Sequence, residues 1–260
     1  MKHGDAGGFD FDPWARLRRF TPARIALGRA GDGLPTARLL EFQAAHALAR
    51  DAVHQPFDAD ALADALAGHP VLTVRSRAPD RATYLQRLDL GRRLHPDDGL
   101  LLSGARCQGD GTGRTSYDAV IVLADGLSAH ALQDHGAALV GELLGHLAGW
   151  DLAPLVMARQ ARVALGDDVA ATLNAAMALV LIGERPGLTA ADSIGAYLTF
   201  APRPGLTRDA DRNCVSNIRP DGYPPVPAAE MIAWLMGQAR RLGLTGIGLK
   251  QDRPAALAGA

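Results

Sequence analysis

One short stretch constrains the fold more than any other: an apolar run that ends in a polar turn rich in Gly and Pro. The run covers residues 177–182, and the turn that follows is Gly-Glu-Arg-Pro-Gly at 183–187. An uninterrupted apolar run of this length is typical of a strand that is buried on both faces. In an open α/β sheet, such a turn after a buried strand builds a ligand crevice at the carboxyl edge. The chain is therefore predicted to have a sheet of this kind, with a functional site at that edge.

Further strands and helices alternate along the second half of the chain. Apolar runs and amphipathic patterns predict strands at 117–124, 152–157, 195–200 and 244–249, and helices at 128–147, 167–174 and 227–242. Alternation of elements of this length implies right-handed crossovers. We therefore expect an α/β fold with a Rossmann- or flavodoxin-like, mostly parallel sheet.

The first part of the chain has a different character, because its patterns are mainly helical. Residues 36–53 form the longest predicted helix there, and residues 70–74 a short strand. Residues 103–116 are rich in Gly and lack apolar periodicity, which indicates a linker. We therefore divide the chain into a smaller, mainly helical N-terminal region, residues 1–105, and an α/β domain, residues 106–260.

Charge and cysteine content argue against several classes of function. The net charge of the 260-residue chain is −1, so it lacks the electrostatic footprint of a protein that binds nucleic acid or an anionic membrane. Two cysteines are too few for a disulfide framework or a four-ligand zinc site, and the eight histidines show no metal-ligand spacing. No apolar stretch approaches the ~20 residues that span a bilayer, and residues 1–10 lack the apolar core of a secretory leader. We expect a cytoplasmic protein with no metal ligands of its own.

A first candidate site follows the predicted strand at 117–124, in the motif Asp-Gly-Leu-Ser at 125–128. A helix that starts at the carboxyl edge of a sheet offers free backbone N–H groups to a polar or anionic ligand. Ser128 is placed to cap that helix. The alternative is an ordinary turn between a strand and a helix.

A second candidate is the turn at 183–187. Glu184 would sit at the mouth of the sheet, where its carboxylate can accept hydrogen bonds from a ligand amide or hydroxyl. Arg185 would pair with Glu184 or bind phosphate. The alternative is a surface turn with an exposed ion pair, which contributes little.

A third candidate is Cys214, which lies in the segment Asp-Arg-Asn-Cys-Val-Ser-Asn-Ile at 211–218. Its Asn and Ser neighbours form local hydrogen bonds that favour turns. The sequence shows no base that would activate a nucleophilic thiol. A packed thiol that touches a ligand is the interpretation we favour, and covalent catalysis is the alternative.

An Arg-rich stretch occupies the end of the N-terminal region. It comprises Arg75, Arg77, Arg87, Arg92 and Arg93, with Tyr84 among them. Arg and Tyr favour interface hot spots, so the stretch could bind a partner. The alternative is a solvated basic face.

Six motifs, taken in order, resemble the small (light) subunit of ethanolamine ammonia-lyase. They lie at 23–31 (Ala-Arg-Ile-Ala-Leu-Gly-Arg-Ala-Gly), 74–76 (Val-Arg-Ser), 89–94 (Asp-Leu-Gly-Arg-Arg-Leu), 125–128, 183–187 and 213–218. No single motif is specific, but their order is, and the resemblance covers most of the chain.

The resemblance implies a subunit of an adenosylcobalamin enzyme that converts ethanolamine to acetaldehyde and ammonia by radical chemistry. In this family a large subunit, a TIM barrel, holds the substrate and most catalytic groups. The small subunit caps the barrel and helps to bind the cofactor between the two chains. The family's cobalamin contacts fall here on Val163, Glu184 and Cys214. The physical argument also selects Glu184 and Cys214, whereas Val163 comes from the resemblance alone, and no catalytic residue is expected in this chain.

Two other classes of function stay open from the sequence. A stand-alone cobalamin carrier or sensor would use the same binding residues, and an independent hydrolase would use Asp125, Ser128 or Cys214. Several relatives carry a longer N-terminal extension that is linked to packaging in a bacterial microcompartment. Only a short lead precedes Asp12 here, so we expect a free cytoplasmic enzyme at least as readily as an encapsulated one.

Overall fold

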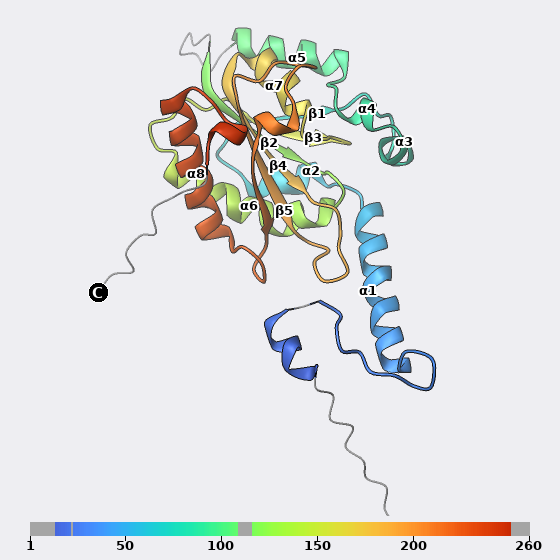
Figure 1. Cartoon of the computed structure of the whole chain (residues 1–260). Coiled ribbons are helices and arrows are strands. Elements are labelled where there is room, and N and C mark those ends of the chain that lie inside the picture. Colours follow the sequence, from blue (N-terminus) through green and yellow to red (C-terminus); the bar gives the residue numbers. More distant parts are fainter. Residues whose placement is uncertain (1–13, 22, 109–115, 251–260) are drawn as a thin grey trace, which may run out of the picture.

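The computed structural model describes residues 14–21, 23–108 and 116–250, which form a six-stranded sheet with helices on both faces (Figure 1). The strands are β1 (Val71–Arg75), β2 (Tyr117–Ala124), β3 (Leu155–Arg159), β4 (Ala175–Gly183), β5 (Ile194–Phe200) and β6 (Asn213–Ile218). Their order in the sheet is β1-β3-β2-β4-β5-β6. The predicted α/β class is confirmed.

Most of the helices pack around this sheet, and the N-terminal helix extends away from it (Figure 1). They are α1 (Thr36–His54), α2 (Ala59–Ala65), α3 (Arg81–Gln86), α4 (Leu88–Gly91), α5 (Pro96–Gln108), α6 (Ala129–His146), α7 (Leu165–Leu173) and α8 (Pro225–Leu242). Three short 3-10 turns, η1 (Ala15–Phe20), η2 (Asp209–Asp211) and η3 (Gly246–Gly248), complete the described elements. None of the described helices is long and apolar enough to cross a membrane.

The parallel part of the sheet creates the crevice. Strands β1, β3, β2 and β4 run parallel, with Val122 of β2 opposite Val156 of β3 and Val180 of β4. Helix α6 connects β2 to β3 on one face, and α7 connects β3 to β4 on the other. The connections that leave the neighbouring strands β2 and β3 therefore go to opposite faces, and open α/β sheets bind ligands at such a switch point.

The other half of the sheet is antiparallel, so the sheet is mixed. Strand β5 pairs antiparallel with β4, and β6 pairs antiparallel with β5. No helix lies in the connection between β4 and β5, residues 184–193. A parallel pairing needs a crossover of a dozen or more residues, so this short loop dictates the antiparallel arrangement.

Two expectations for the C-terminal part of the chain, the turn around Cys214 and the strand at 244–249, are wrong. The segment around Cys214 is not a polar turn but an edge strand, because β5 supplies its backbone hydrogen bonds and Val215 and Ile218 enter the core. The strand expected at 244–249 is instead a loop with the turn η3. There the Asn213 side chain accepts a hydrogen bond from the Gly246 N–H (2.8 Å) and donates to the Leu249 carbonyl (2.8 Å).

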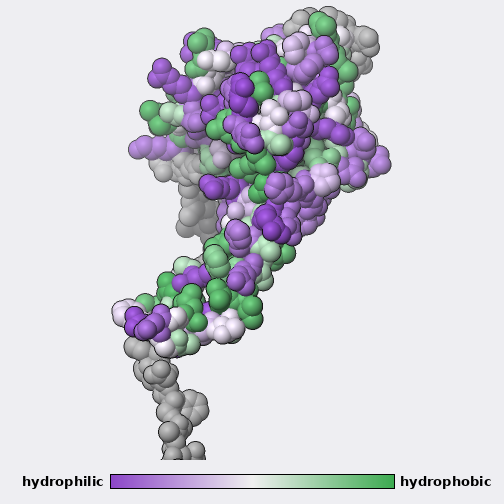
Figure 2. All heavy atoms as spheres, turned by 90° about the vertical axis from the view of Figure 1, so that its right-hand side faces the viewer, coloured by the Kyte–Doolittle hydropathy of each residue, from purple (hydrophilic) through white to green (hydrophobic). Residues whose placement is uncertain are grey.

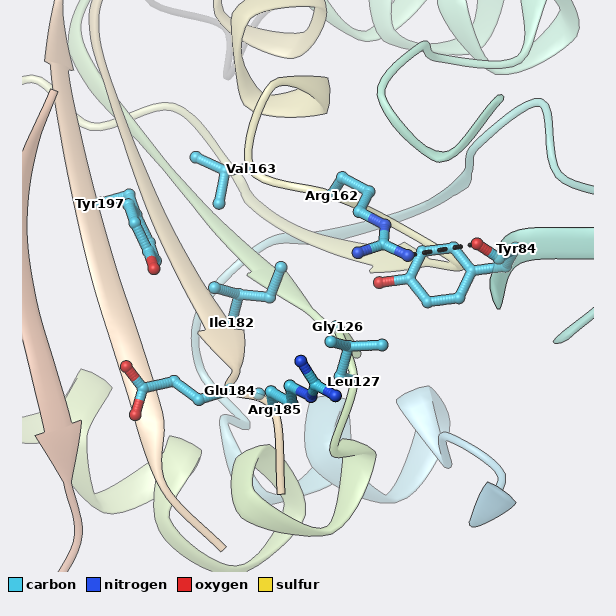
Figure 3. Close-up of a pocket in the computed structure, with 10 residues that line it drawn as sticks. Tyr84, Gly126, Leu127, Arg162, Val163, Ile182, Glu184, Arg185 and Tyr197 are labelled. Atoms are coloured by element: carbon cyan, nitrogen blue, oxygen red, sulfur yellow. Dashed lines mark hydrogen bonds between the residues drawn. The ribbon is translucent and has the colours of Figure 1, made fainter. Parts of the chain in front are cut away.

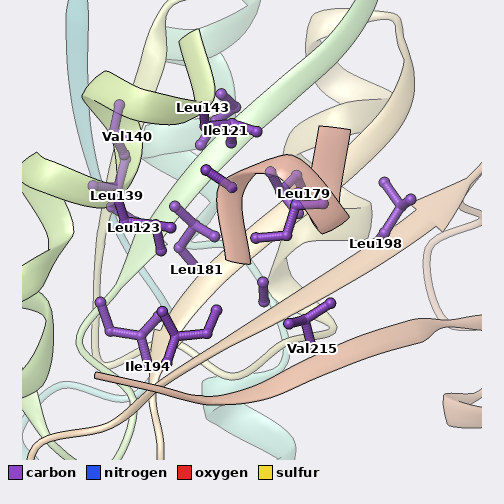
Figure 4. Close-up of a cluster of buried hydrophobic side chains, with 14 of the residues drawn as sticks. Ile121, Leu123, Leu139, Val140, Leu143, Leu179, Leu181, Ile194, Leu198 and Val215 are labelled. Atoms are coloured by element: carbon purple, nitrogen blue, oxygen red, sulfur yellow. The ribbon is translucent and has the colours of Figure 1, made fainter. Parts of the chain in front are cut away.

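Two apolar layers hold the body together. Figure 4 shows the larger one, in which Leu139 and Leu143 of α6 pack on side chains such as Leu123 and Leu179 of the sheet. On the opposite face, Val169 and other residues of α7 cover the other side of the same strands. Each fully buried aliphatic side chain contributes roughly 1.5–3 kcal/mol, so this part of the chain has a self-sufficient core.

The N-terminal arm, residues 14–21 and 23–54, is built differently. Its helix α1 matches the predicted helix and projects away from the body (Figure 1), and Ala52 near its end is its only fully buried residue. Figure 2 shows hydrophobic side chains gathered along the arm. Strand β1 precedes the predicted boundary at 105/106 and helix α5 runs across it, and the two lie in the sheet and its helical layer. Residues 109–115 of the predicted linker fall outside the described residues.

Candidate functional site

A cavity of about 440 Å³ opens at the carboxyl ends of β2, β3 and β4, at the switch point of the sheet (Figure 3). Its wall includes Tyr84, Gly126, Arg162, Val163, Glu184 and Tyr197. A smaller cavity of about 230 Å³ lies beside it and is lined by Cys214. Arg162, Val163 and Tyr197 line both cavities, so the three predicted contacts Val163, Glu184 and Cys214 border two adjoining cavities, which together are called the recess.

Two glycines let the turns after β2 and β4 pack against each other. Gly126 has φ +56°, and a Cβ atom on it would overlap the Gly183 carbonyl oxygen. A Cβ atom on Gly183 would overlap the Ser128 carbonyl oxygen. The Leu127 N–H donates to the Gly183 carbonyl at 2.9 Å, so the two turns form one rigid rim.

Asp125 is buried beneath this rim and does not line the cavity. Its carboxylate accepts hydrogen bonds from the backbone N–H groups of Gln160 (2.8 Å) and Ala161 (3.0 Å). Burial raises the pKa of the Asp125 carboxyl above its ordinary value, although these donors and nearby Arg81 oppose the increase. Gln160 has φ +54°, so Asp125 holds a strained turn that leads the chain into Val163.

Ser128 occupies the position before α6 but does not cap the helix with its side chain. Its hydroxyl instead donates to the Ala191 carbonyl at 2.8 Å. The expected cap is therefore replaced by a contact that ties the β4–β5 loop to the start of α6.

Glu184 lies at the mouth of the sheet, where the sequence argument placed it. One carboxylate oxygen, Oε2, accepts hydrogen bonds from the Ser193 hydroxyl (2.6 Å) and the Asn217 N–H (3.0 Å). The side chain of Arg185 points to another side of the cavity (Figure 3), and in the described part of the chain it forms no ion pair with Glu184. The second oxygen, Oε1, is available to a ligand, because no described group donates to it.

Cys214 faces Tyr197, which lies directly opposite it on β5. Burial raises the pKa of the Cys214 thiol, the negative charge of Glu184 raises it further, and a hydrogen bond with Tyr197 acts in the opposite direction. The thiol is therefore protonated at neutral pH, which suits a packed contact and disfavours a nucleophile.

A buried ion pair fixes the start of β6 against α7. Arg212 donates to both oxygens of Asp167 (2.7 and 2.6 Å) and to the Thr199 hydroxyl (2.7 Å). Both charged side chains are only 2% exposed. Removal of one partner would strand the other charge in the interior, so this pair sets the position of Cys214 relative to Val163.

Sequence reasoning missed three residues of the recess: Tyr84, Arg162 and Tyr197. Tyr84 is fully buried, and the guanidinium groups of Arg81 and Arg162 lie 4.9 and 4.5 Å from its ring centroid. The Arg-rich stretch around Tyr84 was the available signal, but it suggested an exposed partner surface. A buried Tyr84 belongs instead to the wall of the recess.

The arginines of that stretch are mostly engaged within the chain. Arg75 pairs with Asp97 and Asp98, Arg87 with Asp89, and Arg93 with Asp168. Arg92 is exposed, and no acidic partner is found for it in the described ranges. Within the same ranges, no three or more His, Cys, Asp or Glu side chains lie together in a group that could hold a metal ion.

Comparison with known proteins agrees with the motif order. The family model for the ethanolamine ammonia-lyase light chain matches residues 11–250. The ethanolamine ammonia-lyase small subunit of Azotobacter vinelandii is 53% identical over 245 residues, 93% of this chain and 89% of that protein. The small subunit of Ralstonia nicotianae is 50% identical over 244 residues, 92% of this chain and 88% of that protein. With this coverage and the six ordered motifs, the chain belongs to the ethanolamine ammonia-lyase small-subunit family.

Proposed function

We propose that this chain is the small subunit of an adenosylcobalamin-dependent ethanolamine ammonia-lyase, which converts ethanolamine to acetaldehyde and ammonia together with a large subunit. The observation that carries the proposal is the recess at the switch point, where Glu184, Val163 and Cys214 meet. We infer that the parallel strands act as in a Rossmann- or flavodoxin-like sheet. The recess lies at the carboxyl ends of these strands, which is where such sheets bind cofactors.

The residues of the recess suit the edge of a corrin ring, which is an apolar macrocycle with carboxamide side chains. Glu184 offers a free oxygen that would accept a hydrogen bond from a carboxamide N–H. Val163, Ile182 and Tyr197 provide apolar surface for the ring edge. The buried Nε of Arg162 has no hydrogen-bond partner, which is a donor that a ligand oxygen would satisfy.

When bound, adenosylcobalamin supplies the radical chemistry, and this chain supplies position and shielding. In our proposal Glu184 orients a side amide, Val163 packs on the ring edge, and the neutral thiol of Cys214 fills the neighbouring cavity. None of these groups acts as a nucleophile, because the raised pKa of Cys214 disfavours its thiolate. The hydroxyl of Ser128 likewise donates to a carbonyl and has no base beside it.

The large subunit completes the site in this proposal. We infer that it covers the open side of the recess and contacts the N-terminal region, residues 1–105. The support is the arm, where Leu40 and Leu48 of α1 are 58% and 66% exposed. An apolar helix surface of this kind marks a protein interface more often than a solvated face.

The test is ethanolamine-dependent acetaldehyde release by this chain, by the large subunit, and by both co-expressed, each with and without adenosylcobalamin. Activity only with both chains and the cofactor supports the proposal. Deamination by this chain alone contradicts it. Inactivity of the mixture, with cobalamin retained by this chain alone, would favour the carrier or sensor alternative.

The proposal includes a cytoplasmic location for the enzyme, either inside or outside a bacterial microcompartment. Fractionation of the source cells decides between the two, since an encapsulated subunit sediments with the microcompartment shell.

A further inference from the structure

We propose that Arg162 is a cofactor-binding residue and that its guanidinium donates hydrogen bonds to the phosphodiester of the cobalamin nucleotide loop. The inference rests on the proposed function, in which adenosylcobalamin is the ligand. It adds a residue and a ligand group to the three contacts that the family resemblance implies.

The position of Arg162 is the first support. Its side chain lines the larger cavity together with Glu184 and the smaller cavity together with Cys214. Figure 3 shows the guanidinium beside the Tyr84 ring, on the opposite side of the cavity from the Glu184 carboxylate. A ligand that fills the larger cavity would therefore meet Glu184 on one side and Arg162 on the other (Figure 3).

The second support is that several contacts hold Arg162 in place before any ligand arrives. Its backbone N–H donates to the Gly91 carbonyl at 2.8 Å, and its Nη2 donates to the Tyr84 carbonyl at 3.3 Å. A Cβ atom on Gly91 would come within 2.9 Å of the Arg162 Cγ, so only Gly leaves room for the side chain. A donor restrained in this way loses little entropy when it binds.

The third support is unused hydrogen-bonding capacity and uncompensated charge. The Nε of Arg162 is buried and has no hydrogen-bond partner. Three other arginines near the recess pair with carboxylates: Arg81 with Asp125, Arg93 with Asp168, and Arg212 with Asp167. Arg162 forms no ion pair with any described residue of the chain. A partly buried charge that the protein does not neutralise indicates an anionic ligand group.

The neighbourhood of Arg162 strengthens this charge argument. Arg92, which is exposed and has no carboxylate partner among the described residues, lines the same smaller cavity. Asp209, the acidic residue of that cavity, lies 3.8 Å from the Arg212 Nε and is itself 94% exposed. The Arg162 end of the recess thus favours an anion and the Glu184 end an N–H donor. The corrin side amides are neutral, so the phosphodiester is the ligand group that suits Arg162.

The experiment uses the complex with the large subunit and three probes: adenosylcobalamin, adenosylcobinamide phosphate, and adenosylcobinamide, which lacks the phosphate. Arg162→Gln removes the charge and Arg162→Lys keeps it. Arg159→Gln changes an exposed arginine at the end of β3, three residues earlier, that lines neither cavity. Equilibrium dialysis gives each affinity, and a thermal scan without cofactor gives each Tm.

We expect Arg162→Gln to weaken the two phosphate-bearing probes about ten-fold or more, because a hydrogen bond to a charged group is lost. Affinity for adenosylcobinamide should change less than about two-fold, since the lost partner is absent from it. Arg162→Lys should recover part of the loss, and Arg159→Gln should behave as wild type.

An equal loss for all three probes overturns the phosphate assignment, and an equal loss with a lowered Tm shows a purely structural role. Unchanged affinity for adenosylcobalamin removes Arg162 from the binding site while the proposed function stands. A wild-type complex that binds none of the three probes overturns the proposed function and this inference together.

Discussion

Around the recess, Glu184, Asp125 and Arg162 are each held by groups from other elements of the fold. In the N-terminal arm, by contrast, apolar side chains such as Leu40 and Leu48 face solvent. The recess is thus assembled by the chain itself, while the arm buries little of its own surface. In our proposal, the recess works by holding groups in fixed positions, and the arm works by joining a second protein.

The largest effect should come from the rim of the recess. Gly183→Ala should destabilise the fold by about 3 kcal/mol, because the new methyl group overlaps the Ser128 carbonyl and the backbone must move. Chemical denaturation of the isolated subunit measures this loss. Gly141→Ala, at an exposed site of α6 with no atom near the new methyl group, is the control and should stabilise by about 0.5–1 kcal/mol. Equal stabilities of the two variants would mean that the rim is not rigid.

The arm should show the reverse behaviour, with assembly lost and stability kept. Leu40→Glu or Leu48→Glu should weaken association with the large subunit on the order of 30-fold, the effect of losing an interface hot spot. The free energy of unfolding of the isolated subunit should change by less than about 0.5 kcal/mol. Gln43→Glu adds the same charge to α1 without removing an apolar side chain. Undiminished co-purification of both Leu variants would exclude α1 from the interface.

Glu184 separates binding from folding within the recess. Glu184→Ala should weaken adenosylcobalamin binding about ten-fold, and it also leaves the Asn217 N–H without its acceptor. Glu184→Gln keeps an oxygen for that N–H, so it should weaken binding with little change in Tm. Dialysis of the assembled complex, paired with thermal scans, measures both quantities. A fall in Tm for both variants with unchanged affinity would assign Glu184 a structural role alone.

The smallest expected effect is a pH dependence at Cys214. Because burial and the charge of Glu184 raise the pKa of the thiol, alkylation by iodoacetamide should begin at higher pH than for an exposed cysteine. Glu184→Gln removes a negative charge and should move the profile to lower pH, whereas Tyr197→Phe removes the opposing hydrogen bond and should move it to higher pH. Peptide mass spectrometry distinguishes Cys214 from Cys107. A profile that neither substitution moves would mean that Cys214 does not face these two residues.

Local pattern sufficed for the elements that are buried on both faces. Strand β2 has the predicted bounds, and the run at 177–182 lies within β4, because a fully covered parallel strand must be apolar throughout. The long helix α1 was also predicted nearly to the residue. Strand β6 escaped prediction because its residues are polar, and only its pairing with β5 makes it a strand.

The candidate site could likewise be predicted only in part from the sequence. The turn after a buried strand placed Glu184 at the mouth of the sheet, and the ordered motifs identified the family and, by resemblance, Val163 and Cys214. The roles of Tyr84, Arg162 and Tyr197 depend on contacts between segments far apart in the sequence, such as Tyr84 with the Ala161 carbonyl. The pattern of apolar residues that decides which segments are buried can be seen in the sequence itself. The sequence alone therefore determined the class of fold and the edge of the sheet that carries the candidate site. The recess, its paired charges and the unsatisfied nitrogen of Arg162 exist only where separate segments meet, so the tertiary structure alone decided them.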